Sequence, residues 1–286
     1  MAKTRSVNQK TFSIIIAAYN CGQKIEKTIE SILSQNKDLF ELIIVDGAST
    51  DDTLNWINKY ENDITLISEK DDGIYYAFNK AIDLARGKYL YFIGAGDCLR
   101  NNILETMDKH LTGDAVSFVY GDVYLIKQQI YWTGERSKLN LGLQLINHQS
   151  VFYHHKIFDL LGKYDLQYRF WADSAFNLKC FGSRQIKKSY IPHVIADYEG
   201  GGLSETMEDH HFQKDFPQLV RKNLGIRSYL KFVLFSDLYY TVYLSFFRPF
   251  VRPIVLSIRY VKDKVSNIQN SEFNETKKTK NYSVKK

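Results

Sequence analysis

The chain has 286 residues, of which 44% are hydrophobic and 14% aromatic. This composition predicts a packed core and excludes an intrinsically disordered chain. The net charge of +6 is unevenly placed, because residues 227–286 hold 12 basic and 4 acidic residues. The rest of the chain is slightly acidic, and we therefore expect no nucleic-acid partner.

Cysteine usage and the N-terminus indicate the compartment. Cys21, Cys98 and Cys180 are widely spaced, form no C-x-x-C pair and are odd in number, which argues against a disulfide framework or a zinc site. The first residues, MAKTRSVNQKTF, precede only a short apolar run and lack the hydrophobic region of a secretory signal. We therefore expect a cytoplasmic protein.

Residues 12–120 alternate between strand and helix patterns. The β-branched run FSIIIAA is followed by Ile25, Ile29 and Ile32, which recur at the spacing of one helix face. ELIIVD with DDTLNWINKY, and ITLIS with GIYYAFNKAIDLA, repeat this unit, and KYLYFIGAGD adds a fourth strand. Continuous apolar strands joined by crossover helices predict an α/β fold with a mostly parallel central sheet.

The remaining chain divides by composition. Residues 114–195 mix strand and helix patterns, so we expect residues 1–225 to form a single α/β domain. Residues 226–265 are mostly apolar and aromatic, with basic residues interspersed. Their longest run without a charged residue is ten residues, which is too short to span a bilayer. They predict a helical membrane-associating extension, with packing onto the domain as the alternative. The Lys-rich residues 266–286 are predicted to be disordered.

Polar residues follow the predicted strands, and ligands of such sheets bind at the carboxyl ends of the strands. Asn20, Asp46, Asp72 and Asp97 all fall at strand ends. Neither the G-x-G-x-x-G of a dinucleotide site nor a P-loop is present. The remaining chemistry suits ribose hydroxyls, base imino groups and a divalent cation on a diphosphate.

Five segments resemble successive motifs of a known family: FSIIIAAYN, LIIVDGASTDDT, EKDDGIYYAFNKAIDLARGKYLYFIGAGD, HQSVFYHH and ADSAFNLK. They are similar to the family 2 inverting glycosyltransferases with a GT-A fold, in particular the bacterial branch that builds surface polysaccharides. The resemblance covers residues 11–204 and implies that residues 1–225 form one nucleotide-binding GT-A glycosyltransferase domain. It implies transfer of a hexosyl or N-acetylhexosaminyl group, with inversion, from a UDP-linked sugar to a hydroxyl of a growing, lipid-linked glycan. An anionic membrane surface, the inner face of the plasma membrane, is then the expected partner.

The resemblance also implies a donor site. Asp46 and Asp72 would hold the nucleoside, and Asp97 would hold Mg²⁺ or Mn²⁺ on the diphosphate. Ala95 stands where the family's Asp-x-Asp motif has its first carboxylate. The other residues that match the family's nucleotide-sugar site are Ala18, Asn20, Gly73, Asn79 and Lys80.

For the acceptor side, the resemblance implies that Asp173 is the catalytic base. His148, Gly201 and Gly202 match segments near the donor phosphates or the acceptor.

Simpler roles remain open for these residues. Each aspartate lies near a predicted helix start, where Asp is a favoured cap. His148 is equally typical of a hydrogen-bonded core histidine, and the glycines of a flexible turn. Two other functions also remain, a nucleotidyltransferase and a non-catalytic nucleotide-sugar-binding relative, the latter because of Ala95.

Overall fold

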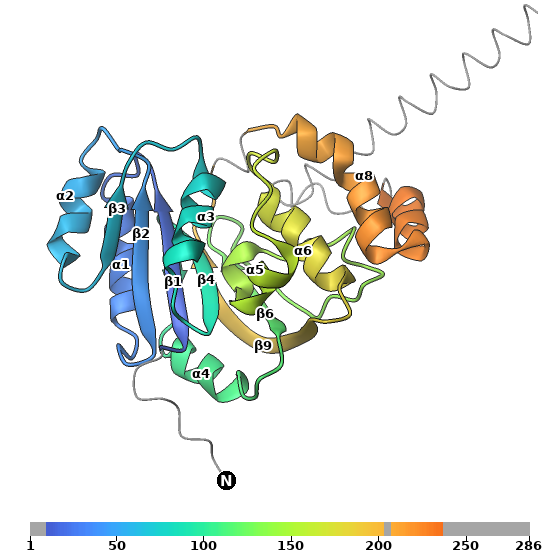
Figure 1. Ribbon diagram of the computed structural model, residues 1–286, viewed down its shortest axis with the longest axis horizontal. Coiled ribbons are helices and arrows are strands. Elements are labelled where there is room, and N and C mark those ends of the chain that lie inside the picture. Colours follow the sequence, from blue (N-terminus) through green and yellow to red (C-terminus); the bar gives the residue numbers. More distant parts are fainter. Residues whose placement is uncertain (1–9, 203–206, 237–286) are drawn as a thin grey trace, which may run out of the picture.

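In the computed structural model, which describes residues 10–202 and 207–236, a nine-stranded sheet separates two layers of helices (Figure 1). The strands are β1 (Phe12–Ala18), β2 (Phe40–Asp46), β3 (Thr65–Ser68), β4 (Tyr89–Gly94), β5 (Cys98–Leu99), β6 (Ser117–Leu125), β7 (Ile130–Trp132), β8 (Val151–His154) and β9 (Lys187–Tyr198). The helices are α1 (Lys24–Leu33), α2 (Thr53–Ile57), η1 (Asn58–Tyr60), α3 (Ile74–Leu84), α4 (Ile103–His110), η2 (His148–Ser150), α5 (Lys156–Leu161), α6 (Ala172–Gly182) and α8 (His210–Leu224). Residues 226–236 are also helical.

The first half of the sheet is parallel, as predicted. Its strands lie in the order β3-β2-β1-β4, and all three pairings are parallel. Ile14, for example, stands beside Leu42 on one side and Tyr91 on the other. These strands carry apolar side chains on both faces because helices cover both faces.

The second half corrects the prediction of a mostly parallel sheet. Strand β8 pairs antiparallel with both β4 and β6, and β7 pairs antiparallel with β6. Strand β9 is parallel to β6 and antiparallel to β5. The connections from β6 to β7 and β8 contain no crossover helix, and a parallel neighbour would need one. The sheet as a whole is therefore mixed.

Two hydrophobic cores lie on the two faces of the sheet. Helices α1 and α4 cover one face, where Ile25, Ile29 and Ile32 are fully buried, as the helix pattern predicted. Helices α3, α5, α6 and α8 cover the other face, which is rich in aromatic side chains. Phe158 and Phe176 stack there with their ring centroids 5.0 Å apart. This packing holds α5 against α6 on that face of the sheet (Figure 1).

The helix at residues 226–236 has two different faces. Phe232 is 1% exposed and packs against Phe216 of α8, with 5.4 Å between their ring centroids. The opposite face exposes Ile226, Leu230 and Leu234. Thus the described start of the predicted extension packs onto the domain with one face only. The rest of that extension, 237–265, and the predicted tail, 266–286, lie outside the described residues. No helix in the described ranges is both long and apolar enough to cross a bilayer.

Candidate active site

A cavity of about 550 Å³ opens at the carboxyl ends of β1 and β4. Its wall is formed by the loops after these strands, by η2, by the start of α6 and by the segment after β9. A space of this size is typical of small-molecule sites and is large enough for a nucleotide sugar. The cavity therefore lies where a ligand was expected.

The predicted site residues divide into two groups. Those that line the cavity are Asn20, Asp97, His148, Asp173, Gly201 and Gly202. Those that lie outside its lining are Ala18, Asp46, Asp72, Gly73, Asn79 and Lys80.

Asp46 shapes a loop rather than facing the cavity. Its carboxylate is fully buried and accepts hydrogen bonds from the backbone N–H of Ser49, at 3.0 Å, and the hydroxyl of Ser68, at 2.7 Å. The loop that it fixes is joined to Asn20, whose side-chain oxygen accepts from the backbone N–H of Thr50 at 2.9 Å. Asn20 has a φ of 45°, a left-handed conformation that Asn tolerates better than most residues.

Asp71, and not its neighbour Asp72, points toward the end of β2. Asp72 is exposed, whereas Asp71 is half-buried and accepts a hydrogen bond from the backbone N–H of Gly73 at 3.0 Å. A side-chain carbon placed on Gly47 would lie 3.2 Å from an Asp71 carboxylate oxygen and 3.3 Å from the ring of Tyr19. Burial raises the pKa of Asp71.

Tyr19 and Asp71 were not among the predicted site residues. Tyr19 lines the cavity with 64% of its surface exposed, whereas Asp71 lies outside the lining, beside Gly47. The signals were present in the segments AAYN and EKDDG. Adjacent aspartates cannot be told apart by spacing alone, because the backbone decides which carboxylate turns inward.

Asn79 and Lys80 serve the scaffold. The Asn79 side chain donates to the backbone oxygen of Tyr164 at 2.9 Å and accepts from its N–H at 3.0 Å. Lys80 forms an ion pair with Glu69. Ala18 is buried at the end of β1. These contacts hold α3 against the neighbouring loops.

Asp97 is buried at the other end of the cavity. It is 5% exposed and accepts hydrogen bonds from the side-chain amide of Gln149, at 2.7 Å, and the backbone N–H of Glu199, at 2.9 Å. Burial raises its pKa to about 6, although these hydrogen bonds oppose the shift. Gly96, with a φ of 101°, leaves room for the Glu199 carboxylate, which a side chain at that position would meet.

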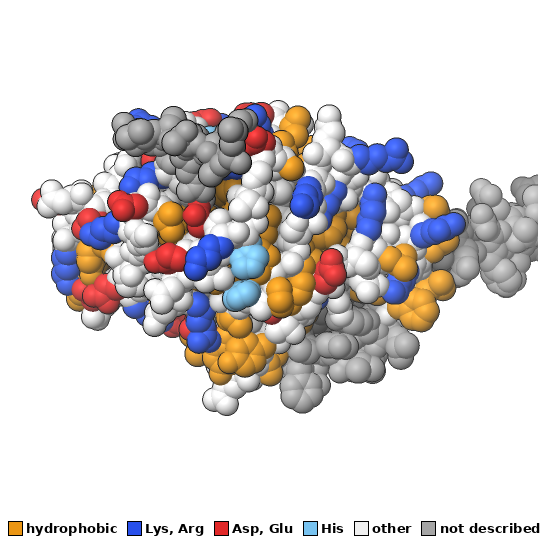
Figure 2. Space-filling model, turned by 90° about the horizontal axis from the view of Figure 1, so that it is seen from below, with side chains coloured by type: hydrophobic (Ala, Val, Ile, Leu, Met, Phe, Trp, Pro, Cys, Tyr) orange, Lys and Arg blue, Asp and Glu red, His pale blue; other side chains and the backbone are white. Residues whose placement is uncertain are grey.

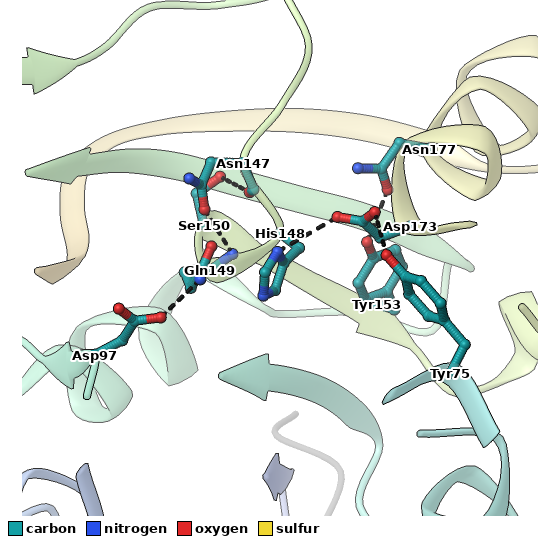
Figure 3. A network of polar contacts seen from close by, with 9 residues as sticks. All are labelled: Tyr75, Asp97, Asn147, His148, Gln149, Ser150, Tyr153, Asp173 and Asn177. Atoms are coloured by element: carbon teal, nitrogen blue, oxygen red, sulfur yellow. Dashed lines mark hydrogen bonds and ion pairs between the residues drawn. The ribbon is translucent and has the colours of Figure 1, made fainter. Parts of the chain in front are cut away.

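Asp173 stands at the first turn of α6, but it does not cap the helix. The N-cap is Trp171, and no side-chain cap hydrogen bond is formed there. One Asp173 oxygen accepts from the Tyr75 hydroxyl at 2.7 Å, and the other lies 3.3 Å from Nδ1 of His148 (Figure 3). Tyr75 comes from α3 and His148 from η2, so three elements hold this carboxylate at the cavity wall.

His148 is not a fully satisfied core histidine. Its Nδ1 faces Asp173, whereas Nε2 is buried without a hydrogen-bond partner among the described residues. Gly201, with a φ of 82°, and Gly202 also line the cavity. A side-chain carbon on Gly201 would lie 2.4 Å from the amino group of Lys127, so this glycine permits a close approach.

The fold is thus an α/β sheet with a cavity at the carboxyl ends of β1 and β4, and the carboxylates of Asp97 and Asp173 line that cavity. The chain belongs to glycosyl transferase family 2, whose sequence model matches residues 13–176. The resemblance predicted from the motifs is therefore confirmed, and the nucleotidyltransferase alternative is set aside.

Individual relatives agree with this family. The PGL/p-HBAD biosynthesis glycosyltransferase of Mycobacterium tuberculosis is 36% identical over 228 residues, 76% of this chain and 87% of that protein. The Escherichia coli UDP-Glc:alpha-D-GlcNAc-diphosphoundecaprenol beta-1,3-glucosyltransferase WfaP is 38% identical over 139 residues, 46% of this chain and 55% of that protein. The crystal structure of S. aureus TarS 1–349 in complex with UDP shares the fold with a TM-score of 0.59 at 18% identity, covering 83% of this chain and 73% of that one.

Proposed function

We propose that this glycosyltransferase moves a sugar from a UDP-linked donor to a hydroxyl of a lipid-linked glycan, with inversion, in surface polysaccharide synthesis. The observation that carries the proposal is the buried carboxylate of Asp173, which faces the same cavity as Asp97. One carboxylate can serve the acceptor and the other the diphosphate. The relative WfaP supports the donor and acceptor classes, because its name gives UDP-Glc and a diphosphoundecaprenol-linked sugar.

The nucleoside binds beside Tyr19. This aromatic ring is exposed in the cavity wall, and the Asp71 carboxylate lies beside the same glycine, Gly47. An exposed ring can stack on a base, and a carboxylate can accept from an imino N–H or a ribose hydroxyl. Asp71 thus takes the role that the sequence reasoning assigned to Asp72.

Asp97 fits as the single protein ligand of a divalent cation. Each of its oxygens accepts one hydrogen bond, which leaves lone pairs for a metal. No group of three or more His, Cys, Asp or Glu side chains in the described ranges could hold a metal ion, so diphosphate oxygens and water would complete the octahedron of Mg²⁺ or Mn²⁺. The cation would neutralise charge on the leaving diphosphate.

Asp173 is the general base of this reaction. Tyr75 fixes the carboxylate by donating to one oxygen, and the other, which lies 3.3 Å from Nδ1 of His148, keeps a further lone pair for the acceptor hydroxyl. The acceptor oxygen attacks the anomeric carbon on the face opposite the diphosphate while Asp173 removes its proton. A single displacement of this kind inverts the anomeric centre and needs no carboxylate nucleophile.

The enzyme works at an anionic membrane surface, at the inner face of the plasma membrane. Ile226, Leu230 and Leu234 form an exposed apolar stripe, 53%, 50% and 71% exposed. Arg227 and Lys222 are exposed nearby in the chain. Figure 2 shows basic and hydrophobic side chains together at the end of the molecule that carries α8. Such a surface binds the boundary of an anionic bilayer.

A panel of nucleotide sugars tests the proposal. The purified full chain is incubated with each sugar and a polyprenyl-diphosphate-linked acceptor, in Mn²⁺, Mg²⁺ or EDTA, and nucleotide diphosphate release is measured. Release that requires acceptor and cation, with an inverted product linkage, is expected. Binding without turnover would identify a non-catalytic relative, and EDTA-insensitive turnover would remove the metal role of Asp97.

A further inference from the structure

His148 has one ring nitrogen that the fold leaves without a partner. Nδ1 lies 3.3 Å from an Asp173 oxygen, but Nε2 is buried and has no hydrogen-bond partner in the described part of the chain. A buried polar nitrogen without a partner is costly. Because His148 lines the cavity, a bound ligand is the natural partner of Nε2.

The loop around His148 is rigid, so the direction of this nitrogen is set by the fold. The Asn147 side chain accepts from the backbone N–H of Gln149 at 2.9 Å, and the Ser150 hydroxyl donates to the Asn147 backbone oxygen at 2.7 Å. The Tyr91 hydroxyl donates to the Gln149 backbone oxygen at 2.6 Å. These bonds hold the His148 ring in place before any substrate binds. A donor that is preorganised in this way needs no rearrangement during the reaction.

The position of the ring indicates what Nε2 meets. Figure 3 shows His148 between Asp97 and Asp173, with its second nitrogen turned away from Asp173. In the function proposed above, on which this inference rests, Asp173 serves the acceptor and Asp97 the diphosphate. The acceptor hydroxyl already has its base. The group left for Nε2 is therefore the anionic leaving diphosphate.

We infer that His148 is a second catalytic residue, which donates Nε2–H to the β-phosphate oxygen of the leaving nucleotide diphosphate. Its Nδ1 remains directed at Asp173. One imidazole thus connects the general base to the leaving group.

The reaction balances with these roles. The acceptor oxygen forms a bond to the anomeric carbon, and its proton passes to Asp173. The bond from the anomeric carbon to the β-phosphate oxygen breaks, and the electron pair stays on that oxygen. The Nε2–H of His148 forms a hydrogen bond to this oxygen and stabilises its developing charge.

Two substitutions separate the nitrogens. His148→Asn places an amide nitrogen near the position of Nδ1, and His148→Gln places one near the position of Nε2. UDP and UMP binding to the full chain, with Mn²⁺ present, is measured by calorimetry, because their difference reports the β-phosphate contact. His211→Asn, an exposed histidine of α8, is the matched control.

His148→Asn is expected to weaken UDP binding about ten- to a hundred-fold, the range for a hydrogen bond to a charged group, while UMP binding stays unchanged. His148→Gln is expected to retain part of the preference for UDP. In turnover assays, His148→Asn should lower kcat more than it raises KM. Melting temperatures of both variants confirm that they fold.

Two results would overturn the inference, and they differ. If the wild-type chain prefers UDP over UMP and His148→Asn keeps that preference, the role of His148 fails alone. If the wild-type chain shows no preference for UDP, the proposed donor fails and the inference fails with it.

Discussion

The two halves of the sheet bring their residues to the cavity by different routes. On the donor side, β1 and β2 end in neighbouring loops that bond to each other, as Asn20 does to Thr50. At the end of the cavity that holds Asp97, His148 and Asp173, the contacts join distant parts of the chain. Tyr75 and Asp173 are 98 residues apart, and the Glu199 N–H that binds Asp97 is 102 residues away.

One part of the site is thus formed by loops of neighbouring strands, and the other by residues far apart in the sequence. The donor loops follow from parallel strands whose ends meet at one edge, and their polar groups are largely satisfied within the fold. The end of the cavity with Asp97, His148 and Asp173 keeps an unsatisfied nitrogen on His148 and a carboxylate, Asp173, that is held by a tyrosine rather than by a helix end. The chemistry is therefore expected on the side assembled by long-range contacts.

The largest expected effect comes from Asp173→Asn. Loss of a general base lowers the rate by about 10² to 10⁴-fold, whereas UDP affinity and melting temperature should stay near wild type, because Asn keeps the shape and the Tyr75 contact. Asp159→Asn, an exposed first-turn aspartate of α5, is the matched control and should change none of the three. A near wild-type rate for Asp173→Asn would leave the acceptor side without an identified base.

Asp97→Asn should change the pH dependence of stability in the ligand-free protein. Burial raises the Asp97 pKa from 3.8 to about 6, so this group stabilises the fold fully below about pH 4 and loses that contribution as pH rises through 6. Asn does not ionise. The free energy of unfolding of the variant should therefore exceed that of wild type by at most about 3 kcal/mol at pH 8. At pH 4 the two proteins should be equally stable.

Urea unfolding at pH 4, 6 and 8 measures the Asp97 effect. Asp38→Asn changes an exposed carboxylate and serves as the control. A gap between wild type and Asp97→Asn that does not vary with pH would contradict the raised pKa.

The pair Asp71→Asn and Asp72→Asn sharpens the donor side. Asp71→Asn should weaken UDP binding by about 1 to 3 kcal/mol, the cost of losing a hydrogen bond to a charged group. Asp72→Asn should leave binding unchanged, since Asp72 is exposed and it is Asp71 that lies beside Gly47. Calorimetric titration of UDP distinguishes them, and the reverse order would return the role to Asp72.

The smallest effect is expected at the membrane stripe. Leu234→Asp should weaken binding to anionic vesicles by roughly 1 to 2 kcal/mol, because it removes part of the burial of one leucine. The wild-type binding should weaken with salt. Leu166→Asp, at an exposed leucine outside this helix, is the control. Equal sedimentation of both variants with vesicles would favour a stripe that covers another protein surface.

The sequence by itself determined the strand and helix order of residues 12–94 and the family. Apolar periodicity is a local property, so the buried faces of β1 and α1 could be read from neighbouring residues. Motif order also placed Asp97, Asp173 and His148 at one cavity before any distance was known.

Only the tertiary structure decided how those side chains are used. Which of Asp71 and Asp72 turns inward depends on the backbone at Gly73 and on the approach of Gly47. The mixed second half of the sheet, and the release of Asp173 from a capping role, depend on partners far along the chain. Packing against such partners sets the direction of a side chain. The spacing of residues within one segment does not reveal which distant residues these partners are.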